Sequence, residues 1–125
     1  MFTEKAFTLS KNTVKLFAKV TIGATGAPTM SVVDSMGVAS VSRTSAGVYK
    51  ITLQDSYPKL LNVDATQILA SGLPASPSFA VKTETVATLA TPVINVCFSA
   101  GGVATEVDSG AVLLIEITLK NSSAI

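Results

Sequence analysis

The chain has 125 residues, with nine basic and eight acidic side chains and a formal net charge of +1. This balance excludes the broad positive field that attracts nucleic acid or an anionic membrane surface. The single cysteine cannot form an internal disulfide, and no apolar stretch approaches the roughly 20 residues of a membrane-spanning helix. The early charges in MFTEKAFTLSKNTVKLF argue against a secretory leader. We therefore expect one domain over residues 1–125, with residues 1–12 as a possible N-terminal arm.

Charged residues are scarce. They make up 14% of the chain, against about 25% in ordinary soluble domains. Hydrophobic residues reach 48%, and 29 residues are serine or threonine, so hydroxyls, alanines and small apolar groups must form most of the surface. Because charge keeps protein surfaces apart, the pattern favours an exterior that partners cover. The alternative is a weakly charged domain that tolerates such a surface.

The first half of the chain is typical of short strands joined by turns. Residues 14–22 alternate, with Val14, Leu16, Ala18, Val20 and Ile22 on one face. TMSVV (29–33) leads through the turn DSMG (34–37) into VASVSR (38–43), which predicts a hairpin. A second turn, TSAG (44–47), joins that strand to VYKITL (48–53).

The second half begins with the least strand-like region, residues 54–78, where Pro58, Pro74 and Pro77 exclude a long central strand. PKLLNV or ATQILAS within it is consistent with one short helical turn, with Pro58 at its first position. Further strands are predicted in 79–90, 92–100 and 111–120, and 101–110 is a loop long enough to project from the surface. The sequence therefore predicts an all-β, single-domain antiparallel β-sandwich or barrel of about eight short strands.

The sequence contains few residues that could form a catalytic or metal-binding site. The absence of histidine excludes the usual triads and imidazole metal sites. Cys97 lies in INVCFS, which predicts a buried thiol on a central strand with no activating base. Glu106 and Asp108 are close in sequence and could begin a calcium site, but solvated loop charges are the favoured interpretation. We therefore expect no enzyme, no metal and no cofactor.

The basic residues suggest contacts. Lys11, Lys15 and Lys19 recur every four residues, and on a strand they form a basic edge that discourages mispairing, or else a docking patch for an acidic partner. Arg43, the only arginine, comes just before a turn, where a solvated edge charge or a partner contact is expected. The sequon at Asn121 is interpreted as accidental.

Two segments carry a family resemblance. GVASVSRTSAGVYKITLQDSYPKLLNV (37–63) resembles a hairpin and the element after it in small structural proteins of tailed bacteriophages. GGVATEVDSGAVLLIEITLKNSS (101–123) is similar to their C-terminal hairpin, with a small-residue loop, a D-S-G turn and an apolar strand. The resemblance covers about half of the chain and implies a β-rich virion protein, assembled in the host cytoplasm, of the capsid decoration (cement) type.

Decoration proteins of this type often bind the outer shell as homotrimers and bridge neighbouring major capsid subunits without catalysis. The resemblance therefore implies the major capsid protein or other virion proteins as partners. Candidate contact residues are Phe2, Lys5, Phe7, Lys11 and Arg43, because an arm before the first strand can order on a neighbour. A tail, baseplate or head-fibre position is the alternative. A glycan-binding module is less favoured, since the chain has no tryptophan and few other aromatic residues for stacking on a sugar.

Overall fold

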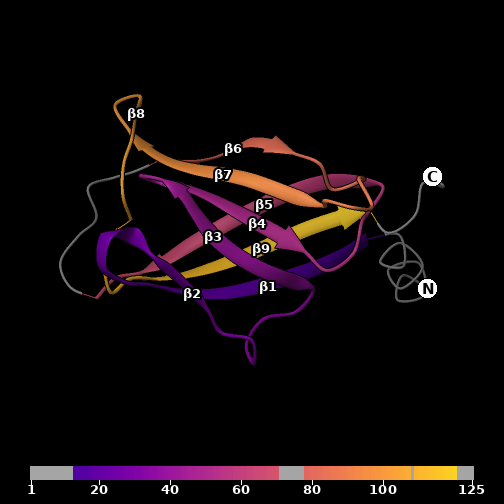
Figure 1. Cartoon of the computed structure of the whole chain (residues 1–125), viewed down its shortest axis with the longest axis horizontal. Helices are drawn as coiled ribbons and strands as arrows, with labels where there is room; N and C mark the ends of the chain where they lie inside the picture. Colours follow the sequence, from indigo (N-terminus) through magenta and orange to yellow (C-terminus); the bar gives the residue numbers. More distant parts are fainter. Residues whose placement is uncertain (1–12, 71–77, 108, 121–125) are drawn as a thin grey trace, which may run out of the picture.

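The computed structural model describes residues 13–70, 78–107 and 109–120 and shows two antiparallel β-sheets packed face to face (Figure 1). The strands are β1 (Thr13–Ile22), β2 (Pro28–Met30), β3 (Val38–Ser45), β4 (Val48–Leu53), β5 (Lys59–Ile68), β6 (Ser78–Glu84), β7 (Val93–Ala100), β8 (Val103–Ala104) and β9 (Val112–Lys120). A 3-10 turn, η1 (Ala24–Gly26), is the only helical element in the described ranges. The predicted all-β sandwich is confirmed, with nine strands.

Each sheet combines strands from both halves of the chain. The first, sheet A, has the order β2-β1-β9-β5, and the second, sheet B, has the order β3-β4-β7-β6, with β8 added beside β7. In sheet A, β9 lies between β1 and β5 and pairs with each along almost its whole length. The final strand therefore ties the first strand to the middle of the chain, and residues far apart in sequence become neighbours on one face.

The inward faces of both sheets form one apolar core. Alternate residues of β1 and β9 are buried, as the period of two predicts, and the corresponding residues of β4 and β7 meet them from sheet B. Tyr49 and Phe98 pack edge to face in this core, with ring centroids 6.0 Å apart. No buried polar or charged residue occurs among the described residues.

The hairpins only partly follow the predicted connections. The turn before Val48 joins β3 to β4 as expected, and Gly47 has the positive φ of 69° that this turn requires. The predicted hairpin between 29–33 and 38–43 is wrong, because β2 pairs with β1 in sheet A while β3 belongs to sheet B. The intervening residues cross between the sheets and include a bridge from Met36 to Phe17.

The helical turn predicted within 54–78 is also wrong, because β5 forms a ten-residue strand there. Pro58 precedes this strand instead of starting a helix, and among the described strands β5 lies at the edge of sheet A and pairs only with β9. Its alternation is hidden in the sequence by a register shift between Leu60 and Asn62, after which Val63 points into the core. The exclusion of a central strand in this region agrees with the edge position.

Candidate interaction surface

The outer face of sheet A combines apolar and charged side chains in register. On β1 and β9, Phe17 lies opposite Glu116 and Lys19 opposite Leu114. On the other side of β9, Asp64 of β5 lies opposite Glu116. Phe17 is 42% exposed and Leu114 is 40% exposed, although both lie in the interior of the sheet. Two large apolar side chains in the middle of a solvent-facing sheet are unusual for a surface that water alone covers.

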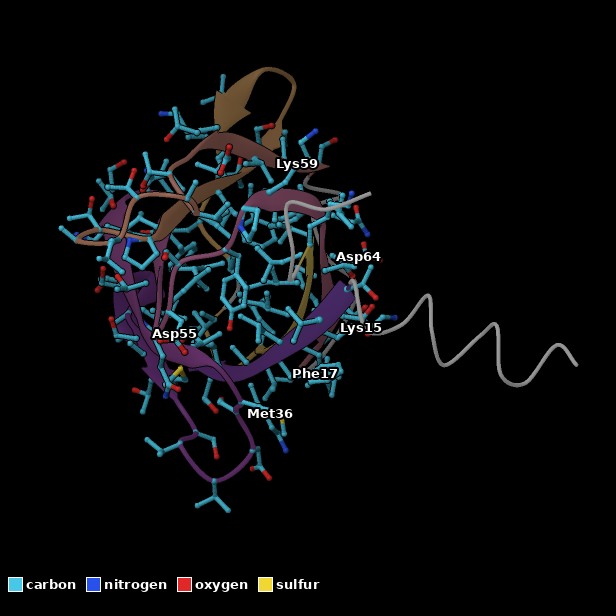
Figure 2. The ribbon with its side chains drawn as sticks, turned by 90° about the vertical axis from the view of Figure 1, so that its right-hand side faces the viewer. Lys15, Phe17, Met36, Asp55, Lys59 and Asp64 are labelled. Carbon is cyan, nitrogen blue, oxygen red and sulfur yellow. The ribbon has the colours of Figure 1, made fainter. Side chains whose placement is uncertain are left out.

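These residues line an open groove, which we call the sheet A groove, with a volume of about 460 Å³. Its floor is formed by β1, β9 and β5, and Asp34 of the β2–β3 connection lines it from outside the sheet. Figure 2 places Lys15, Phe17 and Asp64 on the same side of the sandwich, with Met36 next to Phe17. The side chains that line the groove are Phe17, Lys19, Asp34, Asp64, Thr66, Leu114 and Glu116.

The β2–β3 connection projects from the sandwich (Figure 1), and its Asp34 lines the groove. Val33 in this connection is 94% exposed, and Val32 and Met36 are also exposed. Backbone hydrogen bonds hold both ends of the connection to β1, since Ser31 N donates to Lys19 O and Met36 N donates to Phe17 O. The projecting apolar side chains therefore extend from an anchored base.

Internal hydrogen bonds also brace this connection. The Ser31 hydroxyl donates to Asp34 Oδ2 at 2.9 Å, and the Ser35 hydroxyl donates to the Ser31 carbonyl at 2.6 Å. Ser35 Oγ in turn accepts a hydrogen bond from the Lys19 amide. An anchored and braced projection loses little conformational entropy when a partner covers it, which favours binding.

β2 pairs with β1 only at Val20–Ile22, so in the described residues Lys15 lies on a part of β1 that pairs with β9 alone, and the predicted basic edge stays a prediction there. Lys15 Nζ is 3.4 Å from Glu116 Oε1 in an exposed ion pair, and Lys19 lines the groove. Lys11 is outside the described residues. The alternative, a docking patch for an acidic partner, remains a prediction. The lysines do not form a purely basic patch, because they lie among carboxylates and apolar side chains.

Arg43 occupies a second polar cluster, at the end of the sandwich. Its guanidinium holds the Glu106 carboxylate through two hydrogen bonds, with Nε at 3.1 Å from Oε1 and Nη2 at 2.5 Å from Oε2. Glu106 Oε1 also accepts a hydrogen bond from the Gly47 amide at 3.1 Å. The cluster thus joins β3, the β3–β4 turn and the loop before β9, and Glu106 is not the solvated loop charge that we expected.

The electrostatics of this cluster follow from its hydrogen bonds. Hydrogen bonding to the Arg43 guanidinium, reinforced by the Gly47 amide, holds the pKa of Glu106 below its usual value. The same pair raises the pKa of Arg43. Burial raises the pKa of the neighbouring Tyr49 phenol, whose hydroxyl donates to the Gly26 carbonyl at 2.9 Å. These hydrogen bonds favour the ionised forms of Arg43 and Glu106 and so stabilise the pair in the folded protein.

The remaining predicted site residues have separate fates. Phe2, Lys5, Phe7 and Asp108 lie outside the described residues, so their predicted roles stay predictions. Cys97 lies on β7, an interior strand of sheet B as expected, but its side chain is half-buried on the outer face because Val96 and Phe98 take the inward positions.

Sequence reasoning missed Phe17, Leu114 and Met36. Phe17 falls at an outward position of β1, alternating with lysines, and an aromatic residue in that position is a detectable signal. The run from Val112 to Ile115 is continuously apolar, and on an alternating strand half of such a run must point away from the core. Met36 gave no signal, because its bridge to Phe17 depends on the tertiary fold.

Within residues 13–70, 78–107 and 109–120, no three or more acidic or cysteine side chains gather in a way that could hold a metal ion. Among the same residues, no helix has the length and apolar character needed to cross a membrane. No family model, curated protein or solved structure matches this chain.

Proposed function

We propose that this chain is a non-enzymatic structural protein that works by protein–protein contact through the outer face of sheet A. The observation that carries the proposal is the exposure of Phe17 and Leu114 in the middle of that face, next to the projecting Val32, Val33 and Met36. Apolar side chains gathered on one face beside charged groups are typical of a protein interaction surface.

Within that class, we propose a capsid decoration protein of a tailed-bacteriophage virion. The support is the resemblance of residues 37–63 and 101–123 to virion structural proteins, together with the low charge of the whole chain. A subunit that is present in many copies and covered by neighbours needs fewer charges for solubility than a free monomer does. Each contact can be weak, because several linked contacts in one homo-oligomer raise the apparent affinity.

The test is to add the purified full-length protein to virions that lack it, and then to challenge the particles with heat or osmotic shock. We expect saturable binding to the shell and a delayed release of DNA. A double variant, Phe17→Thr with Leu114→Thr, should bind poorly, since threonine keeps the β propensity but removes the apolar anchors. Failure of the wild-type protein to bind the shell would refute the decoration role.

Copy number separates the shell from other virion positions. Mass spectrometry of purified particles should find hundreds of copies per virion for a shell protein. A few tens or fewer would favour a tail, baseplate or vertex position and would overturn the decoration assignment.

A further inference from the structure

The sheet A groove has an unbalanced charge. Three carboxylates line it, from Asp34, Asp64 and Glu116, against the one lining ammonium of Lys19, and Glu116 also pairs with Lys15. Phe17 and Leu114 add exposed apolar surface between these charges. The groove therefore fits an extended segment that combines apolar side chains with a net positive charge.

The chain itself contains such a segment immediately before β1. Residues 1–12 read MFTEKAFTLSKN, with two lysines against one glutamate. In an extended segment of this sequence, Lys5, Phe7, Leu9 and Lys11 fall on one side. Two adjacent apolar side chains with a lysine at each end complement a groove that holds Phe17 and Leu114 together with three carboxylates, although Lys19 lies directly opposite Leu114.

We propose that residues 1–12 of one copy bind the sheet A groove of a second copy. Phe7 and Leu9 pack on Phe17 and Leu114, and the two lysines of the segment face the carboxylates of the groove. The inference rests on the proposal that this face is an interaction surface, but not on the virion assignment. The proposed partner of the sheet A groove is therefore a second copy of the chain.

Chain geometry favours a second copy over the same copy. β1 begins at Thr13 and runs toward Phe17 and Lys19, so residues 1–12 would have to reverse direction before Thr13 to reach the groove of their own copy. The segment has no glycine or proline, so a reversal there would depend on Ser10 and Asn12. Twelve extended residues span up to about 40 Å, which is long enough to reach a neighbour. Repeated head to tail, this contact builds a ring if the rotation between copies closes and an open filament if it does not.

Photo-crosslinking of the full-length protein tests the occupant directly. With p-benzoylphenylalanine in place of Phe7, we expect an interchain product whose crosslinks map to Phe17, Leu114 or Met36. The same probe at Leu89, an exposed residue of the β6–β7 connection, should give no crosslink to the groove. Crosslinks that stay within one chain, crosslinks to another surface, or no crosslink from position 7 would each overturn the proposal.

Charge reversal provides a second test by sedimentation velocity. The double variant Lys5→Glu with Lys11→Glu should weaken self-association at least about tenfold. Adding Asp64→Lys should restore part of that loss. Adding Asp55→Lys instead should restore none of it, because Asp55 lies on the opposite side of the view from Asp64 (Figure 2). Equal rescue by both, or no loss at the start, would contradict the pairing.

These outcomes are separable from the proposed function. A protein that binds the shell through sheet A but is monomeric, without crosslinks from position 7, would refute only the exchange of residues 1–12. A protein that forms the crosslinked oligomer but ignores virions would refute only the decoration role.

Discussion

Both outer faces of the sandwich are formed by antiparallel sheets, but the side chains that they expose differ in chemical character. The outer face of sheet A carries Phe17 and Leu114 beside lysines and carboxylates, whereas that of sheet B carries mostly hydroxyl and amide groups. On sheet B, Ser42 lies opposite Lys50, which lies opposite Asn95. The Asn95 side chain donates to the Thr83 hydroxyl at 2.8 Å, so the face satisfies part of its own hydrogen bonding. The outer face of sheet B is therefore suited to contact with water, whereas the mixed apolar and charged face of sheet A is suited to a protein partner.

The comparison requires a correctly folded sandwich, in which the turn at Gly47 lies tightly against the backbone of Phe98 and Thr105. An added Cβ at Gly47 would lie 2.7 Å from the Phe98 carbonyl oxygen, and the φ of 69° disfavours any L side chain. We expect Gly47→Ala to lower the free energy of unfolding by about 3 kcal/mol. Chemical denaturation measures this loss.

Gly101→Ala is the matched control for this substitution. Its φ is also positive, but an added Cβ would meet no atom within 4 Å. The control should therefore report backbone strain alone, at about 1 kcal/mol. Equal losses at the two glycines would show that the close approach at Gly47 is unimportant.

The apolar anchors of sheet A should matter for binding more than for folding. We expect Phe17→Thr with Leu114→Thr to weaken binding to the partner by roughly 30-fold, because two buried anchors are lost from the interface. The control pair is Leu89→Thr with Val103→Thr, which removes exposed apolar groups from other surfaces and should change affinity less than about twofold. Titration of labelled protein against particles, or of one copy against another, measures both. An equal loss of affinity in the two double variants would show that the outer face of sheet A is not specifically involved in binding.

The polar cluster at Glu106 should give a smaller, pH-dependent effect. Because the pKa of Glu106 is lower in the folded protein, the cluster stabilises the fold above the unfolded carboxyl pKa of about 4.3. That stability is lost as the pH falls through the folded pKa. Glu106→Gln should cost on the order of 1 kcal/mol at neutral pH, a figure reduced for the partial exposure of the side chain.

Thermal unfolding of Glu106→Gln between pH 7 and pH 3 checks this effect, since the gap to wild type should close in acid. Glu116→Gln is the control, because its ion pair with Lys15 is more exposed and should contribute less than about 0.5 kcal/mol. A gap for Glu106→Gln that stays constant down to pH 3 would show that the carboxylate charge is not responsible.

The smallest effects are expected on the outer face of sheet B. Asn95→Ala removes the exposed hydrogen bond to Thr83 and should change stability by less than about 1 kcal/mol. Lys50→Ala removes a charge from the same face. Neither should change partner affinity in the binding assay, and a tenfold loss from either would place the interface on the wrong sheet.

The sequence predicted the fold well where one strand alternates cleanly, as in residues 14–22, 48–53 and 111–120. It failed at β5, because the register shift near Leu60 breaks the alternation and a proline stands just before the strand. Sheet membership also lay beyond reach, since β2 and β3 belong to different sheets although only the turn-like residues 31–37 separate them.

The interaction surface was only partly predictable. Lysines on one side of β1 were visible in the sequence, but the carboxylates near them come from β5, β9 and the β2–β3 connection. Arg43 was expected at a strand end, and its partner Glu106 is 63 residues away in the chain. Such pairs arise from strand order, which a single sequence does not encode in any local pattern.

Hydroxyl-radical footprinting of the full-length protein, free as a dilute monomer and bound to virions that lack it, tests most directly which face meets the partner. Met36, Phe17 and Leu114 should lose most of their reactivity on binding, while Cys97, which lies on the outer face of sheet B, should keep its reactivity. Protection of Cys97 with Met36 and Phe17 unchanged would contradict the assignment of sheet A as the binding face.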